Sequence, residues 1–479
     1  MASRSSRRWR ALCRSSPAAA TAPRRTWSRR QTAGSCRPTT PRRWRGLSTK
    51  RCARGAVWRR WAPPRIVWRA SASIRGSWSR SSCGRCGPWR RPSVRLAFVA
   101  DGRSPIARSW IEYFVRAGHR VHLITTRPCA ALDGLASLDI VPLWRGAGHN
   151  AARRQRHLAL LTGLRHWIGP WLALRRGPML GGILRPLRPD LVHALRVPFE
   201  GMLAAASDPE APLVVSTWGN DLTLHAPSTP FMRWATRSTL RRADALHTDC
   251  GRDARLAQAW GLRRTRPTIV LPGNGGVRRE VFRPEPSPAD PDFGLRPGTV
   301  VVVQPRGLRA YVRSDTFFRA LPRLVDEMPQ MVAVCPAMDG TAEAERWRTR
   351  LGLGDRLRLL PVLDPPSMAA LFRRAAVSVS PSTHDGTPNT LLEAMACGCL
   401  PVAGDLESLR EWIRHEENGL LIDPTDADRL AEAVRRAVRD EALRAGAARI
   451  NARIVAERAD YAREMPRAEA FYENVLRSV

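Results

Sequence analysis

The stretch VRLAFVADGRSPIARSWIEYFVRAGHRVHLIT, residues 94–125, decides the fold of this chain. Its apolar start, Val94 to Ala100, predicts a buried strand, and an amphipathic helix is predicted from about Ile106 to Ala117. Gly118 ends that helix, and a second strand is predicted over 121–125. A strand, a turn, a helix and a strand in this order are typical of the opening of a doubly wound parallel sheet.

Further apolar runs repeat this pattern on both sides of a proline-rich segment. That segment, residues 283–291, reads RPEPSPADP, which can sustain neither a helix nor a central strand and so predicts a linker. Strands alternating with helices on each side predict parallel sheets. The class is therefore α/β, with two Rossmann-like domains facing across a cleft, over residues 93–284 and 285–479. Strands are expected at 190–194, 213–217, 245–248 and 268–271, then at 299–303, 331–334, 356–360, 377–380 and 400–402, with two helices from Asp426 onward.

The charge of the chain is concentrated at its N-terminal end. The 479 residues carry a net charge of +37, but residues 1–92 hold 24 arginines, one lysine and no acidic residue. This segment repeats Arg, Ser, Trp, Pro and Ala without the period of a strand or a helix, so we expect a disordered tail. Its composition leaves four interpretations open: a nucleic-acid-binding arm, a transit peptide, a membrane-surface segment, or translation from an upstream start codon.

The rest of the chain predicts a protein of a reducing compartment. Its cysteines show no disulfide-framework spacing, and no run reaches the roughly 18 to 20 apolar residues that cross a bilayer. We expect a cytoplasmic protein, either free or held at the inner face of the membrane. The cysteines are Cys129, Cys250, Cys335, Cys397 and Cys399.

The most informative motif is PSTHDGTPNTLLEAMACGCLPV, residues 381–402, which follows a predicted strand and contains a predicted helix from Thr390 to Ala396. Turn residues around Gly386 leave backbone N–H groups free where that helix begins, so amides and the helix dipole can hold a diphosphate. Asp385 and Glu393 lie eight positions apart, one on the loop and one on the helix. Their carboxylates can accept hydrogen bonds from sugar hydroxyls.

This motif resembles the donor-binding motif of the family 4 retaining glycosyltransferases, where an acidic residue, seven others and a glutamate precede Ala-Met-Ala-x-Gly-x-Pro-Val. The resemblance implies the GT-B fold and transfer of a sugar from a nucleoside diphosphate sugar with retained anomeric configuration, without a metal or cofactor. It implies that Asp385, a shorter substitute for the usual glutamate, contacts the donor sugar, and that Glu393 binds the ribose hydroxyls. The donor-binding residues of this segment are then Asp385, Gly386, Thr387, Pro388, Asn389, Thr390, Leu391 and Glu393.

A cationic site is predicted at VVVQPRGL, residues 301–308, where a buried strand ends at the carboxyl edge of the second sheet. The family has a Gly-Arg there and a lysine five residues later, and both cations neutralise the leaving diphosphate. By resemblance Arg306 fills the first role and is catalytic together with Asp385 and Glu393. The lysine position falls on Tyr311 or Val312, depending on the end from which it is counted. The candidates to replace that lysine are Arg309 and Arg313.

Three segments of the first domain resemble cleft-lining segments of the same family. They are the turn DGRS at residues 101–104, LVVSTWGNDL at 213–222, and the stretch around 270–284. Many members have histidine where Trp218 stands, and that histidine is implied to touch the donor sugar. We predict no metal site, because the Asp-Pro-Asp triplet at 290–292 lies in the linker. The residues expected to line the acceptor side of the cleft are Gly102, Trp218, Asn220, Asp221 and Asn274.

Residues 157–190 combine two tryptophans and many leucines with arginines. This composition suits either an anionic membrane surface or lipid-linked acceptor, or an ordinary helix pair with its apolar face in the core. The expected partners are thus a nucleotide-sugar donor, a glycan, lipid-linked or small-molecule acceptor, and an anionic membrane surface.

Three alternatives to a working transferase remain. The first is a sugar-nucleotide epimerase, which would need acid-base residues that the motifs do not supply. The second is a transferase fold without turnover. The third is a basic nucleic-acid-binding protein that acts through residues 1–92 and would lose its function with them, whereas a transferase would not and is expected to bind no nucleic acid.

Overall fold

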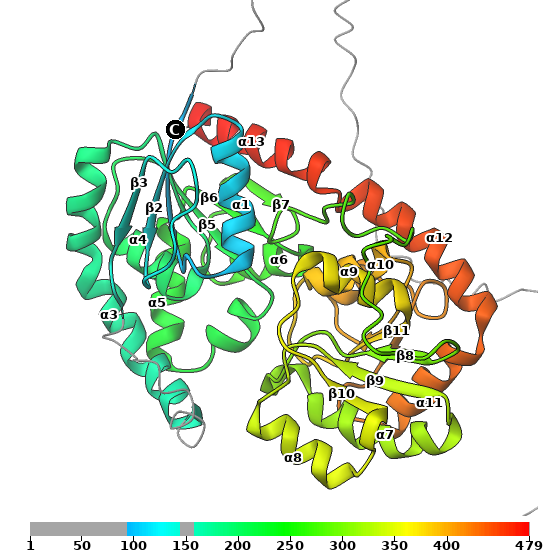
Figure 1. Cartoon of the computed structure of the whole chain (residues 1–479). Coiled ribbons are helices and arrows are strands. Elements are labelled where there is room, and N and C mark those ends of the chain that lie inside the picture. Colours follow the sequence, from blue (N-terminus) through cyan, green and yellow to red (C-terminus); the bar gives the residue numbers. More distant parts are fainter. Residues whose placement is uncertain (1–92, 144–157, 479) are drawn as a thin grey trace, which may run out of the picture. The chain divides into compact units, whose positions relative to one another are not determined.

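The structure is a computed structural model that describes residues 93–143 and 158–478, and it contains two parallel sheets (Figure 1). The prediction of a disordered tail over residues 1–92 lies outside the described residues. The first sheet has seven strands in the order β3-β2-β1-β4-β5-β6-β7, and the second has six in the order β10-β9-β8-β11-β12-β13. Each order reverses at the first strand of its sheet, which is the doubly wound arrangement predicted from residues 94–125.

All strands predicted from the sequence are present, with ends within two residues of the prediction. Two strands were not predicted, and both lie at sheet edges, where half-exposed or very short strands lack a long apolar run. The strands are β1 Arg95–Ala100, β2 Arg120–Thr125, β3 Ser137–Ile140, β4 Leu191–Ala194, β5 Leu213–Thr217, β6 Ala245–Thr248, β7 Thr268–Val270, β8 Val300–Val303, β9 Met331–Cys335, β10 Leu357–Leu359, β11 Ala375–Ser380, β12 Leu400–Gly404 and β13 Leu420–Ile422.

Helices connect these strands and cover the sheets. In the first half they are α1 Pro105–Arg116, α3 Leu158–Leu187, α4 Met202–Ala206, α5 Pro230–Arg242 and α6 Gly251–Ala259. In the second half they are α7 Ser314–Glu327, α8 Ala342–Leu351, α9 Pro365–Arg374, α10 Asn389–Ala396, α11 Ala427–Arg439, α12 Glu441–Arg458 and α13 Tyr461–Ser478. In the described parts of the chain, no helix is long and apolar enough to cross a membrane.

The helix pair predicted within residues 157–190 is wrong, because α3 is one helix with three internal prolines. Two of them, Pro170 and Pro178, directly follow glycines. Glycine lacks the Cβ that normally clashes with the proline ring, so the helix continues through these positions. Gly177 also lies against α4, since a Cβ there would be 2.3 Å from the Ala206 carbonyl oxygen.

Three helices, not the predicted two, follow Asp426. The chain breaks between α12 and α13 because its backbone there pairs with Val277, whose N–H donates to the Ala459 carbonyl at 2.6 Å. The Val277 carbonyl in turn accepts from the Tyr461 N–H at 3.0 Å. This pairing redirects the chain onto the first sheet.

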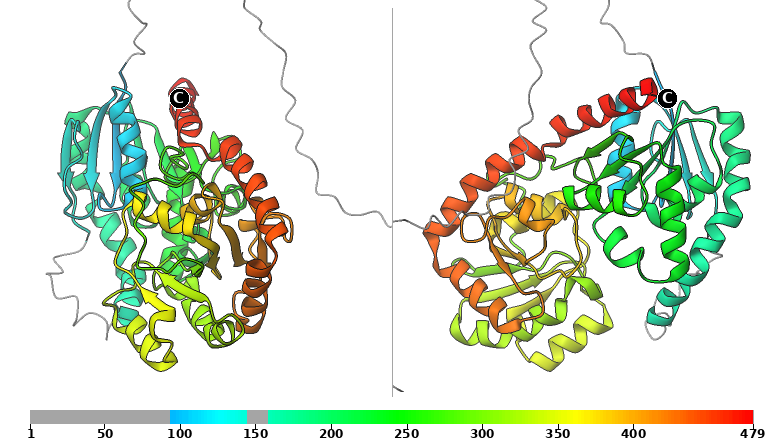
Figure 2. Two further views of the ribbon diagram at one scale, coloured as in Figure 1. Left: turned by 45° about the vertical axis from the view of Figure 1, so that its right-hand side comes forward. Right: turned by 180° about the vertical axis from the view of Figure 1, so that it is seen from behind.

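The last helix, α13, completes the core of the first sheet rather than that of the second (Figure 2). The ring of Tyr472 stacks on Phe114 of α1, with centroids 4.7 Å apart and an interplanar angle of 11°. Met465, Ala468 and Val475 are fully buried in the same cluster as Phe98 of β1. The two ends of the described chain are therefore joined by apolar packing.

Candidate active site

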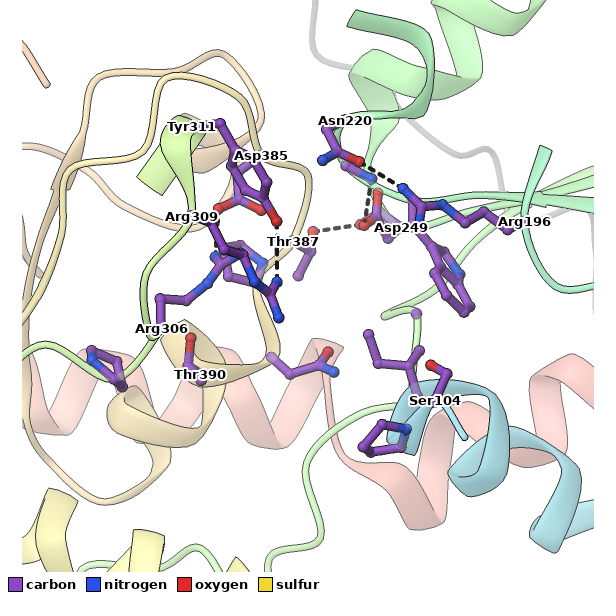
Figure 3. A pocket seen from close by; sticks show the side chains of 18 residues that line it. Ser104, Arg196, Asn220, Asp249, Arg306, Arg309, Tyr311, Asp385, Thr387 and Thr390 are labelled. Carbon is purple, nitrogen blue, oxygen red and sulfur yellow. Dashed lines mark hydrogen bonds and ion pairs between the residues drawn. The ribbon is translucent and has the colours of Figure 1, made fainter. Parts of the chain in front are cut away.

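Two neighbouring cavities lie between the carboxyl ends of the two sheets. The first measures about 450 Å³ and is lined from both halves of the chain (Figure 3). The second measures about 600 Å³ and lies on the other side of the α10 N-terminus. Asn389, the first residue of α10, lines both cavities. Of the residues predicted from sequence, the first cavity collects Trp218, Asn220, Arg306, Arg309, Asp385, Thr387, Pro388, Asn389 and Thr390.

The first turn of α10 can bind an anion beside these cavities. The helix begins at Asn389 after an extended Pro388, so the N–H groups of Asn389 and Thr390 have no acceptor within the helix. The α10 dipole adds partial positive charge at the same place. Asn389 and Thr390, which both line the first cavity, thus offer backbone donors to a phosphate group.

Arg306 and Asp385 form an ion pair inside the first cavity. The Arg306 Nη1 donates to Asp385 Oδ2 at 2.5 Å, and both side chains are only about a tenth exposed. β8 supplies the arginine just past its end and β11 supplies the aspartate from the loop that precedes α10. The pair fixes both groups at the edge where parallel sheets bind ligands.

The second cation of the cleft is Arg309. Its guanidinium lines the first cavity and donates to the Tyr311 hydroxyl, which also lines it, at 3.1 Å. Arg313 does not line either cavity, because its guanidinium makes two 2.9 Å hydrogen bonds to the Asp315 carboxylate. Of the two candidates for the family's lysine, the structure brings only Arg309 to Arg306.

The loop that carries Asp385 is held from the first half of the chain by Arg252. This buried guanidinium of α6 donates to the Asp385 carbonyl at 2.7 Å and to the Gly219 carbonyl at 2.6 Å. It also reaches Asp253 at 2.7 Å and Ser408 at 3.1 Å. One side chain therefore ties the two loops that face each other across the first cavity.

Two glycines allow those loops to touch. A Cβ on Gly219 would lie 2.5 Å from the Gly386 nitrogen, and a Cβ on Gly386 would lie 2.3 Å from Asp249 Oδ1. The Thr387 hydroxyl donates to the Asp249 carbonyl next to this contact. Gly386, predicted to bind the donor, thus lies at the contact between the two halves and outside both cavity linings.

Glu393 and Asn274 line the second cavity, not the first. In the described residues, the Glu393 carboxyl has no hydrogen-bond or ion-pair partner, and burial raises its pKa to about 7. An unpaired carboxyl that faces a cavity is free to accept hydrogen bonds from ligand hydroxyls.

Besides Arg313 and Gly386, three further predicted residues line neither cavity. Leu391 belongs to the apolar core beneath α10. Gly102 packs against Cys129, and its neighbours 104–106 line the first cavity instead. Asp221 is buried, accepts from the Trp218 N–H at 3.0 Å and pairs with Arg196 at 2.8 Å. It therefore positions residues that do line the cavity.

The site also contains residues that the sequence motifs did not predict. Arg196 follows the end of β4 and lines the first cavity, so the strand-end argument that singled out Arg306 applied to it as well. Asp249 and Arg252 follow β6 and had no comparable motif. Their positions depend on how the two halves of the chain pack.

No metal was predicted, and one group of side chains has ligand atoms close enough to be considered for one. Among the described residues, Asp249, Cys250 and Asp253 bring a ligand atom each within 4.8 Å of one another. Burial raises the pKa of Asp249 well above its ordinary range, and the charge of Asp253 raises it further. Burial also raises the pKa of Asp253 to about 6, although Arg252 acts in the opposite direction. Arg252 already supplies a cation to Asp253.

Each half of the chain matches the model of a known family. Residues 101–273 match the model described as Glycosyl transferase 4-like domain, and residues 301–440 match Glycosyl transferases group 1. The chain therefore carries a glycosyl transferase 4-like domain and a glycosyl transferases group 1 domain. Its transferase assignment therefore holds at the level of these domains, and the second matched range contains Arg306, Asp385 and Glu393.

Curated relatives of these glycosyltransferase domains carry the name D-inositol 3-phosphate glycosyltransferase. The protein from Thermobispora bispora is 30% identical over 227 residues, which cover 44% of this chain and 52% of the relative. That from Acidothermus cellulolyticus is 31% identical over 215 residues, covering 42% and 47%. The chain spans about half the length of the curated relatives it matches.

Solved glycosyltransferase structures share the whole fold. Sucrose-phosphate synthase from Thermosynechococcus elongatus superposes with a TM-score of 0.64 at 17% identity, covering 80% of this chain and 99% of that protein. Anabaena HepE in complex with UDP and glucose superposes with a TM-score of 0.62 at 17% identity, covering 79% and 99%. The predicted two-domain GT-B fold is confirmed.

Proposed function

We propose that this protein transfers a sugar from a nucleoside diphosphate sugar to a polar acceptor and retains the anomeric configuration. The observation that carries the proposal is the position of the α10 N-terminus, which lies between the two cavities with Arg306 and Arg309 in the lining of the first. A nucleotide sugar has a nucleoside at one end, a sugar at the other and a diphosphate between them. The two cavities and the cationic junction match that order.

In this arrangement Glu393 accepts hydrogen bonds from ribose hydroxyls in the second cavity. The diphosphate lies against the first-turn amides of α10, and the sugar occupies the first cavity near Asp385 and Trp218. When the bond between the anomeric carbon and the phosphate oxygen breaks, negative charge grows on the diphosphate. Arg306, Arg309 and the helix dipole stabilise that charge, and the departing phosphate oxygen is placed to take the proton of the acceptor hydroxyl.

These cations supply the positive charge that a divalent metal supplies in other transferases, so we propose a reaction that needs neither metal nor cofactor. For the donor, uracil is the first base to test, because the Anabaena HepE structures hold UDP or UDP-glucose. The relatives' name includes an inositol phosphate, which makes polyol and sugar phosphates the first acceptors to test beside glycans and lipid-linked sugars. Arg196 places a guanidinium on the side of the cavity that faces such an acceptor.

We also propose that the protein works at an anionic membrane surface in the cytoplasm. The 30 residues of α3 include no aspartate or glutamate. Its solvent-facing side carries Trp167 (57% exposed), Trp171 (49%) and Met179 (43%), followed by Arg185. The Arg175 guanidinium lies 5.2 Å from the Trp171 ring centre, so cationic and aromatic groups alternate on one face.

The neighbouring helix α5 has the same character. It begins beside α3, where the Thr229 hydroxyl donates to the His166 carbonyl at 3.3 Å, and it contains no acidic residue. Its Trp234 is 54% exposed, next to the exposed Arg233 and Arg237. Aromatic rings at the headgroup level together with unopposed arginines favour anionic lipids.

Vesicle flotation of the full chain tests the membrane proposal. Vesicles of phosphatidylcholine mixed with phosphatidylglycerol are expected to carry the protein, and Trp167→Ala with Trp171→Ala is expected to reduce the bound fraction severalfold. Val362→Ser removes an apolar residue of the second half that is even more exposed, at 82%, and should change nothing. Binding that persists in the double variant would assign the attachment to another part of the chain and overturn the proposal for α3.

Calorimetric titration of the full chain with UDP, GDP and ADP tests the donor site. One nucleotide is expected to bind saturably, and Glu393→Ala should weaken it tenfold or more, because it removes a ribose acceptor from the second cavity. Arg313→Ala is the matched control, since that arginine is paired with Asp315 away from the cavities. If no nucleotide binds, the proposed function is wrong. If one binds but no sugar transfer to any acceptor is detected with UDP-sugars, the fold serves binding without turnover.

A further inference from the structure

A continuous chain of buried hydrogen bonds runs through the first sheet, away from the charged groups of the cleft. The Trp110 indole N–H meets the Tyr472 hydroxyl at 2.8 Å, and that hydroxyl meets His193 Nδ1. His193 Nε2 lies 2.8 Å from Ser216 Oγ, which lies 2.8 Å from His247 Nδ1. The chain ends where His247 Nε2 lies 3.1 Å from the Leu271 carbonyl oxygen.

With neutral imidazoles, the groups at the two ends of this series of hydrogen bonds fix the direction of every bond in it. An indole N–H can only donate, and a backbone carbonyl can only accept. His247 must therefore donate from Nε2 and accept at Nδ1, Ser216 must donate to His247, and His193 must donate to Ser216. Tyr472 then donates to His193. These directions require both imidazoles to be neutral, and burial favours that state because it lowers the pKa of each.

The side chains of this hydrogen-bond series come from three adjacent strands and two helices. His193 lies on β4, Ser216 on β5 and His247 on β6, with Ser216 opposite His247 in the strand register. All three side chains are fully buried. Trp110 comes from α1 and Tyr472 from α13, so the hydrogen bonds cross from the last helix of the chain to the far strands of the first sheet.

The chain ends at the loop that enters both cavities. Leu271 is followed by Gly273, which lines the first cavity, and by Asn274, which lines the second. A Cβ on Gly273 would lie 3.5 Å from the Trp218 indole, so the loop lies against a predicted cleft-lining residue. The Ser109 hydroxyl holds the same loop from α1 by donating to the Asn274 carbonyl at 3.0 Å.

We propose that this directional hydrogen-bond chain positions the loop of residues 271–274 for ligand binding, with Tyr472 and His247, which lie next to its two ends, as positioning residues. Because each member can be satisfied only if its neighbours keep their orientation, a break near α13 also loosens the Leu271 carbonyl. The loop of residues 271–274 then loses its fixed position beside the cavities. The effect on ligand affinity rests on the proposed function, whereas the effect on the loop itself does not.

Tyr472→Phe tests the inference with little loss of volume, since it removes one hydroxyl and keeps the ring that stacks on Phe114. Amide hydrogen exchange of the full chain, followed by mass spectrometry, is expected to show faster exchange in the peptide that covers residues 271–277. Val475→Ala is the matched control, because it weakens α13 packing without touching the chain of hydrogen bonds. Equal exchange in Tyr472→Phe and the wild type, or equal acceleration by Val475→Ala, would overturn the inference.

A double-mutant cycle measures the coupling between Tyr472 and His247 in nucleotide binding, which a purely structural role of either residue would not change. We expect Tyr472→Phe and His247→Leu each to raise the Kd for the nucleotide about fivefold, and the double variant to raise it no further than the larger single effect. His247→Gln keeps a donor for the Leu271 carbonyl and should restore most of the affinity. Effects that multiply in the double variant would show two independent residues and contradict the inference. If the wild type binds no nucleotide, the proposed function fails, and hydrogen exchange alone decides the role of the chain.

Discussion

The guanidinium of Arg252 donates a 2.7 Å hydrogen bond to the backbone carbonyl of Asp385, although the two residues belong to different halves of the molecule. Asp385 in turn accepts from Arg306 through its carboxylate. The geometry of the predicted donor site in the second half is therefore set in part by a residue of the first half. Its variants should affect both affinity and stability.

Arg252→Ala is expected to lower the free energy of unfolding by about 3 kcal/mol, because it leaves the buried Asp253 carboxylate and the Gly219 carbonyl without their donor. Nucleotide affinity should fall with it. Urea unfolding and calorimetry measure the two effects. Arg255→Ala is the control: this arginine of the same helix pairs with Glu407, but both side chains are more than half exposed, so its loss should cost under about 1 kcal/mol.

Arg306→Ala is expected to lower kcat by about a hundredfold or more, because it removes a cation that stabilises the departing diphosphate. Arg306→Lys should recover part of that loss, and Arg309→Ala should show a smaller one. Initial rates of nucleotide release give the values. A variant of Arg306 with wild-type kcat would remove this residue from the catalytic role.

Glu393 makes the stability depend on pH in an uncommon direction. Its pKa rises from an ordinary 4.5 to about 7 in the folded protein, so folding takes up a proton between these values. Stability should therefore fall as pH rises from 4.5 to 7 and stay low above it. Glu393→Gln should stabilise the protein at pH 8 by about 1 to 2 kcal/mol and have no effect at pH 4.5, as thermal melts can show.

Nucleotide affinity should also depend on the protonation of Glu393, but it should increase with pH where stability decreases. The carboxylate is the better acceptor for ribose hydroxyls, so binding is expected to strengthen as pH rises through about 7. Titrations of the wild type and Glu393→Gln at several pH values separate this contribution. The same slope in both proteins would assign the pH dependence to another group.

The buried histidines should make the first sheet sensitive to acid. Burial lowers the pKa of His247 from 6.5 to about 4, so the unfolded chain binds a proton first as pH falls. The stability contributed by the neutral ring is complete above 6.5 and is lost as pH approaches 4. We expect urea midpoints to drop steeply in this window, and His247→Gln to flatten the drop. An unchanged slope in that variant would contradict the assignment.

The sequence predicted the elements whose signal is local. Apolar runs such as Val94 to Ala100 are long and central in their sheets, so their strands were found, whereas the edge strand Ser137–Ile140 has little apolar pattern to find. Asp385 and Glu393 were found because a single motif contains both. The same motif could not show that they serve different cavities, since this depends on the direction in which each side chain leaves the turn and the helix.

The parts of the site that were missed come from contacts between the halves of the chain. Arg252 is one arginine among many, and nothing near it in sequence marks it as the partner of the Asp385 carbonyl. The close approach of Gly219 to Gly386 likewise appears only when both loops are in place. Residues that act across a domain contact carry no local pattern, so the first half of the site was predicted less completely than the second.

The packing of α13 against α1 has a consequence for synthesis on the ribosome. The first sheet is translated early, but its core lacks the apolar side chains of residues 465–475 until the final helix has been made. The half that is synthesised first therefore completes its core only after α13 has been made. Until then Trp110 and Phe114 expose an apolar face that must not form non-native contacts. Emergence of residues 465–475, rather than emergence of the first domain, is the event that allows this part of the protein to reach its native core.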